Sequence, residues 1–152
     1  MKKGTKKAIY FFLRLLFIVY VVLLSYVVFF SERYGRVAYD TMQYNLVPFQ
    51  EINRYLSQIK TITFTAVLNL IGNVIIFIPF GAMLFIWNKK VATFFGTIIL
   101  SFLLSLTIET AQLVSKLGVF DVDDIILNTL GGFIGFIIYK IVYGIYKRRT
   151  KQ

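Results

Sequence analysis

The chain of 152 residues contains no cysteine and no histidine. The first absence excludes disulfides, thiolate chemistry and cysteine-held iron–sulfur clusters. The second removes the side chain that most often moves protons or binds zinc near neutral pH. Charged residues are also scarce, at 16% of the chain, and only seven residues are acidic. Because carboxylates are so few, one that stands within a long apolar segment is a candidate functional group.

Hydrophobic residues make up 58% of the chain and the mean hydropathy is +0.74, which is typical of membrane proteins. Four apolar runs are each long enough to cross a hydrocarbon core of about 30 Å at about 1.5 Å per residue. They cover residues 8–30, 62–87, 91–115 and 125–146. We therefore predict an all-α integral membrane protein of four transmembrane helices, with one domain over residues 1–152 and an outer loop at 31–61.

The net charge of +10 gathers at the ends of these runs, which favours a role in topology and contact with anionic lipid headgroups over nucleic-acid binding. Both tails and the short connection at 88–90 are basic and belong in the cytoplasm by the positive-inside rule. The loop at 31–61 is nearly balanced in charge, and the loop at 116–124 carries one lysine and three aspartates, so both belong outside. Both termini are therefore predicted to be cytoplasmic.

Glu109 lies inside the third run, where a carboxylate costs about 3 kcal/mol on insertion scales. Steps of four back along the helix give Ser105, Ser101 and Thr97, and a step of three forward gives Gln112, so these side chains share one face. We expect this polar stripe to face protein, with Glu109 and Gln112 as ligand contacts. The alternative is a protonated or amide-paired Glu109 that only locks helix packing.

The second and fourth runs carry matching polar faces. Asn73 lies in the second run, and Asn128 in the fourth begins a face that continues through Gly131 and Gly135, a GxxxG pair that allows close helix approach. With Glu109, these groups gather in the outer half of the expected bundle. We expect a polar pocket open to the outer face, with interhelical hydrogen bonding as the alternative role of both asparagines.

Three aspartates, Asp121, Asp123 and Asp124, are expected at the mouth of this pocket. One of Asp123 and Asp124 should cap the fourth helix, where an acceptor satisfies free N–H groups, and the other should face the pocket. Asp121 lies furthest from the expected helix start and should tolerate asparagine best. Such a run can also hold a divalent cation, but it lacks the spacing of an EF-hand, so we expect no metal and no cofactor.

Four sequence blocks stand in a characteristic order and spacing: NLVPF at 45–49, Asn73 followed by FIPFG at 77–81, ETAQ at 109–112, and DVDDIILNTLGG at 121–132. Through these blocks the sequence resembles the VanZ-like family over about residues 45–139. The resemblance implies a small, multi-pass protein of the bacterial cell membrane. Founding members of the family are associated with low-level resistance to glycopeptide antibiotics such as teicoplanin.

The expected function is to bind or modify a cell-surface ligand, either a lipid-linked wall precursor or an amphiphilic antibiotic. Two alternatives stay open: a small proton-coupled transporter, and a membrane-embedded enzyme that acts on a lipid headgroup with Glu109 as base. Because no pairing of nucleophile and base stands out, the presence of any catalysed chemistry is also open. Membrane lipids are expected partners, nucleic acid is not, and a homo-oligomer is left open.

Overall fold

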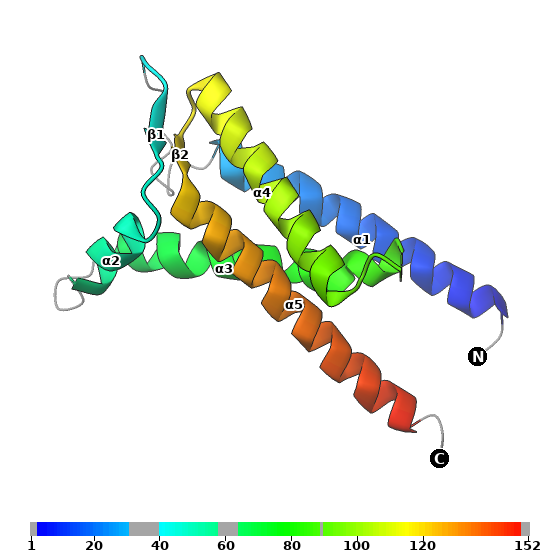
Figure 1. The fold of residues 1–152 in the computed structure, drawn as a ribbon. Coiled ribbons are helices and arrows are strands. Elements are labelled where there is room, and N and C mark those ends of the chain that lie inside the picture. The colour runs from blue at the N-terminus through cyan, green and yellow to red at the C-terminus, as the bar shows by residue number, and fades with distance from the viewer. Residues whose placement is uncertain (1–2, 31–39, 58–63, 89, 150–152) are drawn as a thin grey trace.

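The computed structural model describes residues 3–30, 40–57, 64–88 and 90–149, and helices dominate it (Figure 1). The elements follow one another in the order α1 (Lys3–Phe30), β1 (Gln43–Asn45), α2 (Gln50–Ser57), α3 (Phe64–Met83), a short 3-10 helix η2 (Leu84–Ile86), α4 (Phe94–Ser115), β2 (Val119–Asp121) and α5 (Val122–Arg149). Several sequence features named above lie outside the described residues: 31–39 and 58–61 of the outer loop, the start of the second run at 62–63, Lys89, and the ends of both tails at 1–2 and 150–152.

Four of the described helices are long and apolar enough to cross a membrane. The spans are Lys7–Val27, Asn69–Ile86, Phe94–Ser115 and Val122–Arg149. The expected helical class with four membrane-length helices is therefore confirmed. The cytoplasmic placement of the termini stays a prediction, because length and composition do not orient a bundle.

The centre of the bundle is the contact between α3 and α5, and α5 also packs on α4. Glycines allow this close approach. A Cβ at Gly131 would collide with the carbonyl oxygen of Val74, and one at Gly135 would collide with that of Ile78. Gly81 meets the backbone of Gly132 in the same way from the α3 side. The GxxxG face expected from the sequence is therefore the face that α5 presents to α3.

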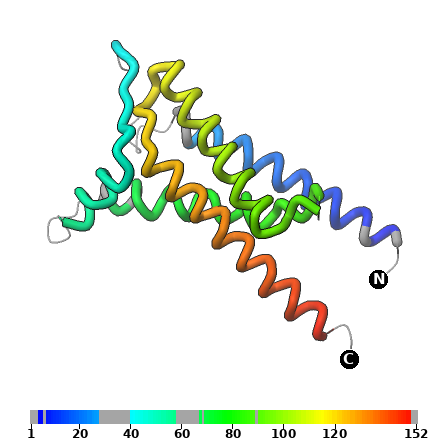
Figure 2. Tube along the Cα trace, viewed as in Figure 1, coloured from blue at the N-terminus to red at the C-terminus, as the bar shows by residue number. Residues whose placement is uncertain are grey.

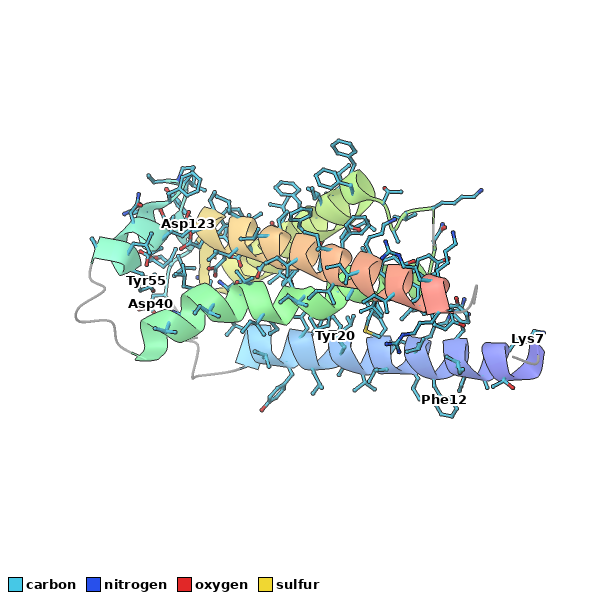
Figure 3. The ribbon with its side chains drawn as sticks, turned by 90° about the horizontal axis from the view of Figure 1, so that it is seen from below. Lys7, Phe12, Tyr20, Asp40, Tyr55 and Asp123 are labelled. Atoms are coloured by element: carbon cyan, nitrogen blue, oxygen red, sulfur yellow. The ribbon has the colours of Figure 1, made fainter. Side chains whose placement is uncertain are left out.

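Two further helices complete the bundle. The side chains of Thr97, Ser101 and Ser105 on α4 are fully buried, as expected for a polar stripe that faces protein. In α1, by contrast, only 6% of the candidate span is buried, so this helix lies at the periphery. Tyr20 of α1 points toward α3 and donates a hydrogen bond of 2.7 Å to the carbonyl oxygen of Ile76 (Figure 3).

The segment between α1 and α3, expected only as a loop, contains two elements in its described part. The strand β1 runs parallel to β2, with Tyr44 opposite Phe120 and Asn45 opposite Asp121. The helix α2 follows at once. The chain trace shows residues 40–57, in cyan, next to the start of α5, in gold (Figure 2). The helix α2 lies at one end of the bundle, and the start of α1 and the end of α5 lie at the other (Figure 1).

Candidate functional site

A cavity of about 380 Å³ lies beneath α2 at that end of the bundle. Its walls come from five elements: β1 and α2, α3, and the β2–α5 junction. Asp123 and Tyr55, which both line it, lie at one end of the molecule, and Lys7 lies at the other (Figure 3). The polar residues of the lining are Asn45, Glu51, Arg54, Tyr55, Asn69, Asn73, Asp121, Asp123 and Asp124.

Asp123 holds α2 in place over the cavity. Its carboxylate accepts hydrogen bonds from the backbone N–H groups of Phe49, Glu51 (2.8 Å) and Ile52 (3.1 Å), at the N-terminus of α2. The side chain is only 1% exposed. A negative charge at this position satisfies N–H groups that have no partner within the helix and opposes the positive end of the helix dipole. Asp123 therefore caps a helix, but the helix is α2 and not the one in which Asp123 stands.

Asp121 is the residue that caps α5. That helix begins at Val122, three residues earlier than the sequence suggested, and the Oδ1 atom of Asp121 accepts the N–H of Asp123 at 2.8 Å. The same carboxylate accepts from the Asn45 amide at 3.3 and 3.4 Å, which ties β1 to β2 through side chains. The expectation that Asp121 stands apart from the helix start was therefore wrong. The apolar run begins only at residue 125, because the first turn of α5 contains Asp123 and Asp124. The run therefore did not reveal where the helix starts.

Burial raises the pKa of the Asp121 carboxyl above its ordinary value of 3.8. The cause is desolvation, which disfavours the ionised form, and the hydrogen bonds from the Asp123 backbone and the Asn45 amide oppose it.

Asp124 joins the α5 side of the cavity to α3. Its Oδ1 atom accepts a short hydrogen bond from the side-chain amide of Asn73. Asn69, one turn before Asn73, also lines the cavity. The polar face of α3 that contains Asn73 thus meets the aspartates.

The remaining three candidates lie behind the cavity wall. Glu109 is 1% exposed, and its Oε2 atom accepts the backbone N–H of Asp121 at 3.0 Å. Asn128 donates from its amide to the Ser105 hydroxyl at 2.9 Å, and Gln112 is buried beside this layer on α4. None of the three is among the residues that line the cavity. The structure thus separates a lining layer, made of Asn73 and the aspartates, from a supporting layer around Glu109.

The part of the α4 polar stripe that lies away from the cavity packs directly against α5. The Ser101 hydroxyl lies against Gly132, where a Cβ would collide with it. Within the described part of the chain, the hydroxyls of Thr97 and Ser101 are buried without a hydrogen-bond partner, as is the Asn128 side-chain oxygen. The stripe therefore acts as a contact surface of small residues at its inner end, and as a hydrogen-bonding layer only around Ser105 and Glu109.

The aspartates do not converge on one point. Asp121 is directed to Asn45 and its own helix, Asp123 to α2, and Asp124 to Asn73. Over residues 3–30, 40–57, 64–88 and 90–149, no three acidic, histidine or cysteine side chains are arranged to hold a metal ion. The three carboxylates instead connect five elements around the cavity, β1, β2, α2, α3 and α5.

Sequence reasoning missed the part of the site that α2 contributes. Glu51 and Arg54 form an ion pair of 2.7 Å on this helix, and Tyr55 lies beside them in the lining. The signal was present as an alternation of polar and apolar residues at helical spacing over 50–57. It was hidden because the segment is short and lies inside a long polar connection.

Together these features define a class: a helical protein with four helices long and apolar enough to cross a membrane and a polar cavity at one end of its bundle. The chain belongs to the VanZ/LLP1 family, whose sequence model matches residues 17–143. Protein VanZ from Enterococcus faecium is 38% identical over 103 residues, which are 66% of this chain and 62% of that relative. The match thus spans about three fifths of the relative's length. No solved structure gives a significant match to the chain.

Proposed function

We propose that this chain is a multi-pass protein of the bacterial cell membrane whose cavity opens on the outer face and binds a cell-surface ligand. The observation that carries the proposal is the cavity itself, which is lined by carboxylates and amides from α2, α3 and α5. Four carboxylates and one guanidinium line it, and its volume of about 380 Å³ falls in the range of small-molecule sites.

The distribution of charge supports the proposed orientation. The last turn of α5 carries Lys147, Arg148 and Arg149, and α1 begins in a lysine-rich segment. Both basic ends lie opposite the cavity, and basic ends favour the cytoplasmic side. This arrangement supports a cavity that faces outward, with Glu109 and Gln112 supporting it from within the membrane.

The lining favours a ligand with positive charge or many hydrogen-bond donors. Arg54 is paired with Glu51 and also favours the ionised form of Asp121, but one guanidinium against four carboxylates leaves an excess of acidic groups. Asp121 and Asp124 each accept from a neutral asparagine amide. A ligand group that donates to these carboxylates would gain charge-assisted hydrogen bonds. The polar parts of a lipid-linked wall precursor and of a glycopeptide such as teicoplanin both fit this description.

Binding is favoured over the two alternative functions. A proton-coupled transporter needs a polar path through the bundle, whereas Ser101 packs directly on Gly132 below the cavity. An enzyme with Glu109 as base would need that carboxylate in reach of the ligand, whereas Glu109 lies behind β2 and accepts the Asp121 N–H. These contacts support a protein that holds its ligand without transforming it.

Orientation can be tested first, because the chain has no cysteine. Ser57→Cys places a thiol on exposed α2, and Asn88→Cys places one in the exposed connection after η2. With a membrane-impermeant maleimide on intact cells, we expect labelling of Ser57→Cys only. Asn88→Cys should react after permeabilisation. The reverse pattern would put the cavity on the cytoplasmic side and remove the proposal.

Function is tested by exchanging lining residues in cells. We expect Asp124→Asn and Asn73→Ala to abolish any protection against teicoplanin at normal membrane abundance. Asp40→Asn is the matched control, because it removes an exposed carboxylate at the same end of the molecule but outside the cavity lining. Equal protection by all three variants would contradict a role for the cavity. Release of a product from a lipid-linked precursor by the purified protein would favour the enzyme instead.

A further inference from the structure

The segment 42–49 and the following α2 expose an unusual number of apolar side chains for a connection between membrane spans. Six of them are each more than half exposed: Met42, Tyr44, Leu46, Val47, Phe49 and Leu56. In water, such a concentration of exposed apolar surface is unfavourable, and on a protein surface it usually marks an interaction site.

These side chains lie level with the end of a membrane span. The strand β2 begins at Val119, shortly after α4 ends at Ser115, and β1 is paired with β2 in register. Lys116, just after α4, also holds the segment in place, because its ammonium group donates to the carbonyl oxygen of Asp40 at 2.8 Å. The segment is therefore held at the depth where α4 leaves the hydrocarbon core.

The apolar surface of the segment continues onto α4. Tyr44 and Leu46 form a shallow apolar groove of about 230 Å³ with Leu113 of α4 and Phe120 of β2. Next to Leu113, Val114 is 66% exposed on a helix long enough to cross the membrane. A surface that lipid covers on α4 thus extends without a break onto β1.

The two strands separate this apolar surface from the cavity. Tyr44 and Phe120 form a cross-strand pair that faces the groove, whereas Asn45 and Asp121 form the next pair and line the cavity. Neighbouring residues of a strand point to opposite sides, so a parallel pair in register gives one apolar and one polar face. The polarity of each face matches a wall with lipid on one side and a hydrated site on the other.

The conformation and exposure of Phe49 give independent evidence for a contact outside the protein. Its backbone lies in the left-handed region, at φ 64°, which glycine adopts far more readily than a bulky residue. The chain nevertheless places a phenylalanine there, and its side chain is 52% exposed. Within the protein this side chain is poorly covered, so its apolar ring is available for a contact outside the protein.

We infer that residues 42–49 form an interfacial membrane segment whose apolar side chains lie among the headgroups and first acyl carbons of the leaflet at the cavity end. The partner is the lipid surface. Aromatic side chains are common at this depth, where an apolar ring and a polar tip are both accommodated. The cavity then lies directly behind a wall immersed in lipid. The inference does not depend on whether the cavity binds a ligand.

Tryptophan fluorescence tests this placement. The chain has one tryptophan, Trp87, so a Trp87→Phe background allows one reporter at a time. Tyr44→Trp and Phe49→Trp report on the segment, and Asn53→Trp on exposed α2 is the matched control. The purified full chain is reconstituted in vesicles of phosphatidylcholine and phosphatidylglycerol. Some vesicles contain lipids brominated near the headgroup, and others contain lipids brominated near the chain end.

We expect the Tyr44→Trp and Phe49→Trp reporters to show blue-shifted emission, to lose intensity mainly with bromine near the headgroup, and to resist quenching by aqueous iodide. The Asn53→Trp reporter should be quenched by iodide and not by bromine. Water-like emission with full iodide quenching at both segment positions would overturn the inference. Shielding from both quenchers would also overturn it, because a second copy of the chain would then cover the segment. Two separate reporters keep the test valid if one variant fails to fold.

Discussion

The exchange of Asp123 for asparagine tests how α2 is held over the cavity. The two carboxylate oxygens of Asp123 share three backbone N–H groups, with Oδ1 serving Phe49 and Oδ2 serving Glu51 and Ile52. Asparagine has one side-chain oxygen and one NH2 group. Whichever oxygen it replaces, at least one N–H loses its acceptor and faces another donor. An ordinary helix cap, which uses a single oxygen, tolerates this exchange, but this contact does not.

The magnitude follows from the burial of the contact. Asp123 is 1% exposed, so water cannot replace a lost partner. One hydrogen bond to a charged group contributes about 1.5–3 kcal/mol. Loss of the negative charge at the α2 N-terminus adds about 0.5–1 kcal/mol. The total of about 2–4 kcal/mol raises the population of detached α2 by roughly 30- to 700-fold.

Hydrogen exchange of the protein in nanodiscs measures this population. Amides of α2, from Gln50 to Ser57, should exchange faster in Asp123→Asn by that factor, whereas amides in the centre of α3 and α5 keep their wild-type rates. Asp124→Asn is the matched control, because it removes a neighbouring carboxylate that accepts from Asn73 of α3. Unchanged exchange over α2 in Asp123→Asn would refute the account of how this helix is attached.

Three further predictions concern the support of the site. Glu109→Gln keeps an acceptor for the Asp121 N–H, so it should fold at normal abundance and keep function. Glu109→Leu removes that acceptor and should stay in the membrane but lose about 1–3 kcal/mol in thermal unfolding. Loss of function in Glu109→Gln at normal abundance would instead show that the charge of Glu109 is needed. Gly135→Ala should destabilise the protein by about 1–3 kcal/mol through collision with Ile78, whereas Gly144→Ala, where a Cβ meets nothing, should not; equal melting temperatures would contradict the packing of α3 on α5. Because the folded-state pKa of Asp121 lies above its unfolded value of 3.8, its contribution to stability is complete below that pH and is lost as the pH rises through the folded pKa. The melting temperature of wild type should therefore fall relative to that of Asp121→Asn as the pH is raised from about 4 to about 7, and parallel curves would argue against the shift.

Helical periodicity made the interior of the bundle predictable. The spacing of Ser101, Ser105 and Glu109 marked the buried face of α4, and that of Gly131 and Gly135 marked the contact with α3. These features arise from positions three and four residues apart, which a helix brings to one side whatever the tertiary structure. The sequence alone therefore predicted the buried faces of α4 and α5.

The cavity could not be predicted in the same way. The hydrogen bond between Asp123 and Phe49 joins residues 74 apart, and β1 and β2 have only three residues each. A strand that short has no readable alternation, and the partner of a carboxylate is set by tertiary packing. The sequence led us to expect that one of Asp123 and Asp124 caps the fourth helix, whereas Asp123 caps α2 and Asp121 caps α5. The same limit concealed Arg54 and Tyr55, whose role depends on where α2 lies.

The central claim is that the cavity beneath α2 holds a cell-surface ligand, and equilibrium binding to the purified chain in nanodiscs tests it most directly. Teicoplanin and a lipid-linked wall precursor would be titrated against wild type, Asp124→Asn and Asp40→Asn. The account predicts saturable binding of at least one of them to wild type. Asp124→Asn should weaken it roughly 10- to 100-fold, as expected for one charged hydrogen bond of about 1.5–3 kcal/mol, and Asp40→Asn should leave it unchanged. Absence of saturable binding of both ligands, or equal affinity in all three proteins, would contradict it.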